Sequence, residues 1–100
     1  MKYLNIIYEE CYDDADIICV PDSIYDNIKE IVTQFLNWLP DAPKTDPDYW
    51  WLREDGNYGQ ILETVGFIKW LNNTHCQNEG NAFIVKQNTN WDPEFGRIDW

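Results

Sequence analysis

The clearest hydrophobic pattern lies in residues 21–39, PDSIYDNIKEIVTQFLNWL. Apolar side chains recur there at intervals of three and four residues, which places them on one side of an α-helix. Asp22 or Ser23 can cap the first turn, and Pro40 ends the helix. We therefore expect one continuous amphipathic helix, whose buried stripe consists of Ile24, Ile28, Ile31, Val32, Phe35, Leu36 and Leu39.

Shorter apolar runs predict strands on both sides of this helix. Residues 3–8 (YLNIIY) and 16–20 (DIICV) are rich in β-branched side chains and can pair as a hairpin. Residues 49–53 and 58–62 flank an Asp-Gly pair, which favours a tight hairpin turn. Residues 82–87 (AFIVKQ) predict the last strand.

A second helix is expected after the second hairpin, over residues 65–73, with Thr64 as its cap. An alternative start near Gly59 would absorb residues 60–63 into the helix. We favour the hairpin, because an Asp-Gly pair between apolar runs is the stronger local signal. Residues 89–100 mix aromatic and acidic residues without a clear period, so they either pack along the domain or are held ready for a partner.

Together these elements predict a single α+β domain over residues 1–100, in the order ββαββαβ. We expect an antiparallel or mixed sheet with both helices packed on one face. Six Trp, six Tyr and four Phe supply the buried area that the core of a 100-residue chain needs.

Charge narrows the class of partner. The formal net charge is −11, and residues 9–30 hold eight acids opposed by Lys29 alone. Such a surface repels phosphate, which argues against direct binding to nucleic acid or to an anionic membrane. Complementary charge instead favours a basic protein partner. Three cysteines without motif spacing, and a sequence without a signal or membrane-spanning stretch, predict a reduced, cytoplasmic protein.

Residue types that carry catalysis are scarce. The sequence contains one histidine, His75, and one serine, Ser23, so a serine triad is not expected. Adjacent residues such as His75 and Cys76 rarely aim at each other as a catalytic pair. The cysteines lack zinc-site spacing, and the acidic run at 9–16 lacks the glycine and final Glu of a calcium loop. We therefore expect no enzyme activity, no cofactor and no bound metal.

The acidic surface is the remaining candidate for function. Asp22, Asp26 and Glu30 recur at intervals of four, so they should share one side of the first helix and extend the acidic loop before it. The interpretation as an ordinary solvated surface carries equal weight. The aromatic and acidic residues near the C-terminus are further candidates. The predicted partner-binding set is Glu9, Glu10, Asp13, Asp14, Asp16, Asp22, Asp26, Glu30, Trp91, Asp92, Glu94 and Trp100.

The chain resembles the small acidic immunity proteins that bacteria encode beside polymorphic or contact-dependent growth inhibition toxins. The similarity lies in size, charge, aromatic content and the segments DADIICVP, EIVTQFLNWLP, DYWW and FIKWLN. It implies an inhibitor that binds a cognate basic toxin, often a nuclease, and occludes its active or substrate-binding site. Two alternatives stay open: a phage-type nucleic-acid mimic that blocks a nucleic-acid-binding protein, and a small metal-binding or enzymatic domain.

Overall fold

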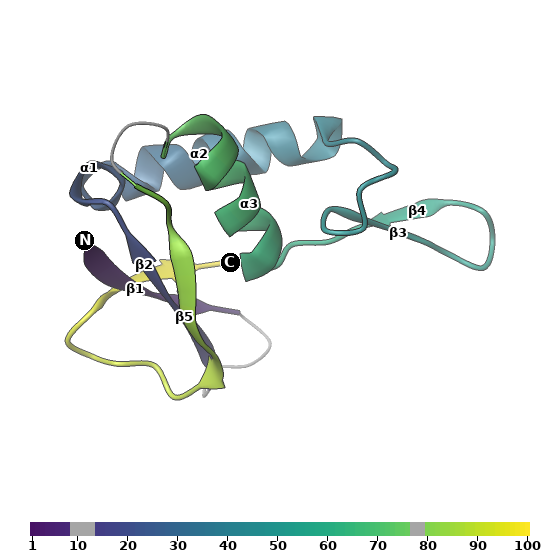
Figure 1. Cartoon of the computed structure of the whole chain (residues 1–100). Coiled ribbons are helices and arrows are strands. Elements are labelled where there is room, and N and C mark those ends of the chain that lie inside the picture. The colour runs from purple at the N-terminus through teal and green to yellow at the C-terminus, as the bar shows by residue number, and fades with distance from the viewer. Residues whose placement is uncertain (9–13, 77–79) are drawn as a thin grey trace.

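Four strands form the main sheet, in the order β5-β2-β1-β6 (Figure 1). The computed structural model describes residues 1–8, 14–76 and 80–100. Strand β1 (Lys2–Ile7) pairs antiparallel with β2 (Ala15–Val20) and parallel with β6 (Gly96–Asp99). Strand β5 (Phe83–Thr89) pairs antiparallel with β2, so the sheet is mixed.

Strands β3 (Trp50–Leu52) and β4 (Tyr58–Gln60) form a separate hairpin. The hairpin shares no ladder with the main sheet and projects away from it (Figure 1). The expectation of one sheet containing every strand is therefore wrong. The predicted turn is confirmed, since the loop between the strands contains Asp55 and Gly56, with Gly56 at a φ of +86°.

Helices α2 (Ile28–Trp38) and α3 (Thr64–Thr74) pack against one face of the main sheet. One buried cluster joins Leu4, Ile6 and Ile18 of the sheet to helix residues that include Phe35 and Phe67. Alternate strand residues point to the same face, so both helices cover the side that Leu4 and Ile6 share. The predicted α+β class is confirmed.

The expected continuous helix over residues 21–39 is interrupted at Asn27. Helix α1 (Asp22–Asp26) ends there, α2 starts at the next residue, and a short 3-10 turn, η1 (Leu39–Asp41), follows. Asn27 has φ −117° and ψ 22°, and its side-chain amide donates to the carbonyl oxygen of Ser23 at 3.0 Å. Asn side chains compete with the backbone in this way, and the interruption is a local effect of that residue.

Two details of the predicted helix also need correction. Pro21 precedes the first turn and no side-chain cap is formed, so neither Asp22 nor Ser23 acts as the cap. The buried stripe includes Ile24, Ile31 and Phe35, whereas Leu36 is 42 % exposed. Ile24 before the break lies in the same buried cluster as Ile31, Phe35 and Leu39 after it, and Ile28 and Val32 pack against that cluster. The break at Asn27 therefore leaves the predicted stripe on one face, and Leu36 alone among its members is exposed.

The segment 89–100 packs on the domain and contributes a strand that its sequence pattern did not predict. Backbone pairing to β1 holds β6, and the Trp100 N–H donates to the Ile7 carbonyl oxygen at 3.0 Å. The Trp100 ring lies 5.9 Å from that of Phe35 and 5.4 Å from that of Phe67. Before β6, the buried Asn5 amide donates to the Asp92 carbonyl oxygen and accepts the Asp92 N–H, both at 2.8 Å.

The second helix begins at Thr64. This agrees with the start that we favoured and not with the alternative start near Gly59. Glu63 occupies the cap position with an extended backbone and makes no capping side-chain bond, while Thr64 is the first helical residue. The predicted role of Thr64 as a local cap is therefore wrong. Its hydroxyl is bonded instead to groups of the main sheet, described below.

Truncating Phe35 tests the core assignment. Phe35 is 0 % exposed and makes edge-to-face or tilted contacts with several other rings, so Phe35→Ala should lower the free energy of unfolding by about 3–5 kcal/mol. The neighbouring exposed Leu36 is the matched control, and Leu36→Ala should cost less than about 1 kcal/mol. Urea unfolding followed by tryptophan fluorescence measures both. Equal losses in the two variants would contradict this core.

Candidate functional site

Asp16, one of the predicted surface acids, lies inside the molecule at 6 % exposure. Its Oδ2 accepts the Thr64 hydroxyl at 2.5 Å and the Tyr8 hydroxyl at 3.3 Å. Its Oδ1 accepts the backbone N–H of Asn88 at 3.1 Å. The prediction that Asp16 faces a partner is wrong, because the carboxylate of this β2 residue is buried against the start of α3.

The same network completes the first turn of α3. The Thr64 N–H donates to the Tyr8 hydroxyl oxygen at 2.9 Å, so a tyrosine from the end of β1 satisfies a helix-terminal donor. The Asp16 carboxylate near this end also suits the positive pole of the helix. Tyr8, Asp16 and Thr64 thus form a structural clamp between sheet and helix.

A hollow of about 400 Å³ adjoins this clamp, and its lining includes Tyr8, Asp16, Glu63 and Asn88. Within the chain, both Asp16 oxygens already accept hydrogen bonds, and the Tyr8 and Thr64 hydroxyls are bonded to each other at 2.8 Å. The polar groups that converge here are therefore satisfied without a ligand, which favours a structural role.

The predicted continuous acidic patch is not formed by the described acids. Asp14 precedes β2, whereas Asp22 follows it, so the two lie at opposite ends of a strand about 20 Å long. Asp22 pairs with the N-terminal ammonium at 2.9 Å, and Asp26 lies 3.8 Å from the Lys2 ammonium. Glu30 is exposed on α2. Glu9, Glu10 and Asp13 lie outside the described residues.

The C-terminal candidates divide between surface and core. Trp91 and Glu94 are exposed, with the Arg97 guanidinium 5.7 Å from the Trp91 ring centre. Asp92 is half-buried and its side chain accepts the Glu94 N–H, which shapes the turn. Trp100 is half-buried against the core, so Trp91 and Glu94 are the two members of this group that are exposed.

Most of the basic side chains are occupied within the chain. Five of the seven lie over aromatic rings, at 4.7–5.7 Å from the ring centres: Lys2, Lys44, Arg53, Lys69 and Arg97. Lys2, Lys69 and Arg97 also pair with carboxylates. In contrast, seven acids are exposed and form no ion pair with the described bases: Asp14, Glu30, Asp41, Glu54, Asp55, Glu63 and Glu94.

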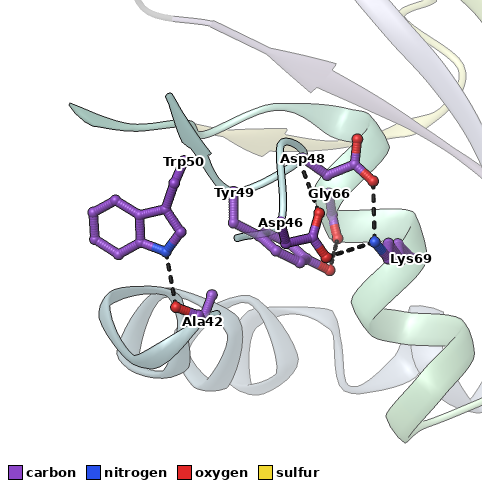
Figure 2. Close-up of polar contacts among 7 residues, drawn as sticks. All are labelled: Ala42, Asp46, Asp48, Tyr49, Trp50, Gly66 and Lys69. Carbon is purple, nitrogen blue, oxygen red and sulfur yellow. Dashed lines mark hydrogen bonds and ion pairs between the residues drawn. The ribbon is translucent and has the colours of Figure 1, made fainter. Parts of the chain in front are cut away.

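The β3–β4 hairpin is fixed to the core at its root, as Figure 2 shows. The buried Tyr49 donates its hydroxyl to the Gly66 carbonyl oxygen of α3 at 3.1 Å. The Trp50 indole N–H donates to the Ala42 carbonyl oxygen at 2.8 Å. On the other strand, the Gln60 amide donates to the Leu39 carbonyl oxygen at 2.7 Å. Both strands are therefore held where they leave the core.

An ion-pair group strengthens this root. The Lys69 ammonium of α3 lies 2.6 Å from an Asp46 oxygen and 3.2 Å from an Asp48 oxygen (Figure 2). Two hydrogen bonds hold the pKa of the Asp46 carboxyl below its usual value. The larger effect comes from Lys69 and the smaller one from the backbone N–H of Asp48. These contacts tie the segment before the hairpin to α3.

Beyond the root, the hairpin carries apolar side chains into solvent. Trp51 is 52 %, Leu52 62 % and Tyr58 43 % exposed. The predicted site set omitted this surface, although the segment DYWW and the Asp-Gly turn were the signals for an aromatic hairpin. The local pattern could not show which of these rings are buried. Tyr49, Trp50 and Trp51 are three consecutive aromatic residues, so the sequence offers no contrast among them, although Tyr49 is buried and Trp51 is exposed.

His75 and its neighbour Cys76 lie in different environments. His75 is exposed and its Nε2 lies 3.0 Å from the Gln34 Oε1, whereas Cys76 is buried. Within residues 1–8, 14–76 and 80–100, no group of three or more His, Cys, Asp or Glu side chains is placed to hold a metal ion.

No family model, curated protein or solved structure matches this chain. Among the described residues, none of the helices has the length and apolar character that crossing a membrane requires.

Removing the Tyr8 hydroxyl tests the clamp. Tyr8→Phe leaves the buried Thr64 N–H without its acceptor, which should lower the free energy of unfolding by about 1–3 kcal/mol. The exposed Tyr58 is the matched control, and Tyr58→Phe should change it by less than about 0.5 kcal/mol. Chemical denaturation measures both, and an unchanged Tyr8 variant would show that the clamp does not hold α3.

Alkaline pH should destabilise the domain through the same residue. Burial raises the pKa of the Tyr8 hydroxyl above its usual value of 10.0, and burial likewise raises that of Tyr49. When the pKa of a hydroxyl is higher in the folded protein than in the unfolded chain, its contribution to the free energy of unfolding is fully present below pH 10. That contribution is lost as the pH rises through the pKa of the folded protein. Denaturation between pH 8 and 12 measures this loss, which should be smaller in Tyr8→Phe than in Tyr58→Phe.

Proposed function

We propose that this chain is an acidic inhibitor of the immunity type, which binds a basic toxin in the cytoplasm and occludes its active or substrate-binding site. The toxin is a protein, and a nuclease suits the charge best, because its nucleic-acid site must itself be cationic. The proposed role is binding rather than catalysis, and it needs no cofactor.

The observation that carries this proposal is the imbalance between available charges. Five of the seven bases are engaged with aromatic rings, while seven exposed acids form no ion pair with the described bases. Bases that lie against aromatic rings offset the field of the acids only in their own vicinity. The electrostatic field farther from the molecule is therefore dominated by the net charge of −11. Such a field accelerates encounter with a cationic protein and repels nucleic acid.

The described acids favour this function over nucleic-acid mimicry. A mimic needs carboxylates spaced along a ridge in place of phosphates. Asp14 and Asp22 lie at opposite ends of β2 and Asp16 is buried between them, so these three do not form such a ridge. A diffuse negative field, by contrast, suffices to steer a basic protein.

The proposal is tested by reversing exposed charges and measuring association with the protein that the adjacent gene encodes. Asp14→Lys, Glu30→Lys and Glu94→Lys together change the net charge from −11 to −5, since each adds +2. In low salt the association rate constant should fall roughly tenfold, because steering depends on complementary charge. Stopped-flow fluorescence measures this rate, and the difference should shrink in ~0.5 M salt.

The opposite change provides the control. Lys29→Glu with Lys86→Glu changes the net charge from −11 to −15, and association should become faster. Wild-type protein should also abolish the toxin's activity when the two are mixed. Failure of the wild type to form a complex, or equal rates for the −5 and −15 variants, would overturn the proposed function.

A further inference from the structure

The β3–β4 hairpin presents the residue types that dominate binding energy at protein interfaces. Trp, Tyr and Arg are enriched among such hot spots, and Trp51, Arg53 and Tyr58 are all exposed on this hairpin. Leu52 adds the most exposed large apolar side chain of the described residues, at 62 %. Leu52 and Tyr58 pair across the hairpin and share one face, whereas Trp51 lies on the other face, so both faces of this small projection carry exposed apolar side chains.

These side chains are pre-organised before any partner binds. A Cβ added at Gly59 would overlap the indole ring of Trp51, so this ring lies directly over the glycine of the opposite strand. The Arg53 guanidinium lies 5.5 Å from the Trp51 ring centre, and the Lys44 ammonium lies 5.7 Å from that of Tyr58. Ordering that is already present lowers the entropy cost of binding.

The backbone beneath them is also held in place. An isolated two-stranded hairpin is marginally stable in water. Here the Tyr49 and Trp50 hydrogen bonds on one strand, and that of Gln60 on the other, fix the root to the core. The Arg53 N–H donates to the Asn57 carbonyl oxygen at 2.7 Å and closes the turn. The hairpin therefore projects as an ordered element.

Its shape and charge indicate what kind of surface receives it. A projecting two-stranded ribbon, about 10 Å thick with its side chains, fits a cleft rather than a flat surface (Figure 1). The tip carries Glu54 and Asp55, both exposed and without an ion pair to the described bases. Carboxylates at the leading end suit a cleft lined by cations.

A second exposed apolar surface, on β5, is less suited to docking. Strand β5 is a sheet edge with Phe83 and Val85 exposed, but its pairing with β2 shifts register twice. Asn88 there has a φ of 52°, and Lys86 adds a charge to the strand. Irregular pairing and an edge lysine are features that discourage strand addition.

We infer that the β3–β4 hairpin is the element that enters a cationic cleft of the protein partner, with Trp51 and Tyr58 as anchors and Glu54 and Asp55 facing the cations. The inference rests on the proposed function, and it adds the part of this chain that occludes the toxin's site. Overall charge then accelerates encounter, while the hairpin provides affinity.

Two tryptophans provide a matched test against the purified product of the adjacent gene. Trp51 and Trp91 are both exposed, at 52 % and 40 %, and each lies beside an arginine. Trp51→Ala should weaken the complex about tenfold or more, whereas Trp91→Ala should change affinity less than about twofold. Isothermal titration calorimetry measures affinity, and circular dichroism with thermal melting verifies that both variants are folded.

Two further variants test the position of the Trp51 ring and the charge of the hairpin tip without removing the Trp51 side chain. Gly59→Ala keeps every contacting side chain but displaces the Trp51 ring, so it should also weaken binding about tenfold. Glu54→Lys with Asp55→Lys should weaken binding more than Asp14→Lys with Glu94→Lys, although both pairs change the net charge equally, from −11 to −7, since each substitution adds +2.

The outcomes are distinct. Wild-type affinity in Trp51→Ala or Gly59→Ala, an equal loss in Trp91→Ala, or unchanged affinity after reversal of the tip would overturn the hairpin assignment while leaving the inhibitor function intact. Absence of any wild-type complex would instead overturn the proposed function itself.

Discussion

The fold depends on the packing of aromatic rings around Phe35. This fully buried side chain lies 5.1–6.3 Å, centre to centre, from the rings of Trp38, Phe67, Trp70 and Trp100. The cluster thereby joins α2, α3 and the end of β6 in one contact set. A 100-residue chain buries a modest fraction of its surface, so few large rings must replace many small aliphatic contacts. The high aromatic content follows from this requirement, and it leaves other rings for the surface.

Hydrophobic periodicity predicted the elements that bury a regular face, and it failed where hydrogen bonds decide. Strands β1 and β2 and both main helices follow from their apolar patterns. Strand β6 contains one buried apolar residue, Ile98, and its formation depends on pairing with β1, some 90 residues away in sequence. The interruption at Asn27 is likewise set by a polar side chain rather than by the apolar pattern. The pairing of β6 becomes visible only when its tertiary partner is known, whereas the interruption is a local bond from Asn27 to Ser23 that apolar periodicity does not report.

Asp16 shows why the acidic surface was predicted only in part. Within an acid-rich segment its carboxylate is indistinguishable from that of Asp14, which is exposed. Its partners, Tyr8 and Thr64, come from the end of β1 and the start of α3, and Thr64 is 48 residues away from Asp16. Burial of this carboxylate is tolerated because hydroxyl and amide donors replace its hydration. The formal net charge follows from a count of residues, but the distribution of that charge depends on contacts between distant residues.

The division of tryptophans between core and surface connects fold with function. Trp50 and Trp51 are neighbours in one strand, and the alternation of strand side chains sends them to opposite faces. Trp50 binds the Ala42 carbonyl and holds the root, while Trp51 lies over Gly59 with about half its surface in solvent. Exposure of Trp51 adds nothing to the core, yet the surrounding contacts keep its ring in one position. A diffuse negative field can speed the encounter with many cationic proteins, but it cannot select one. Selection requires a shaped, ordered surface, and among the described residues the hairpin combines fixed geometry with exposed rings and unpaired charge.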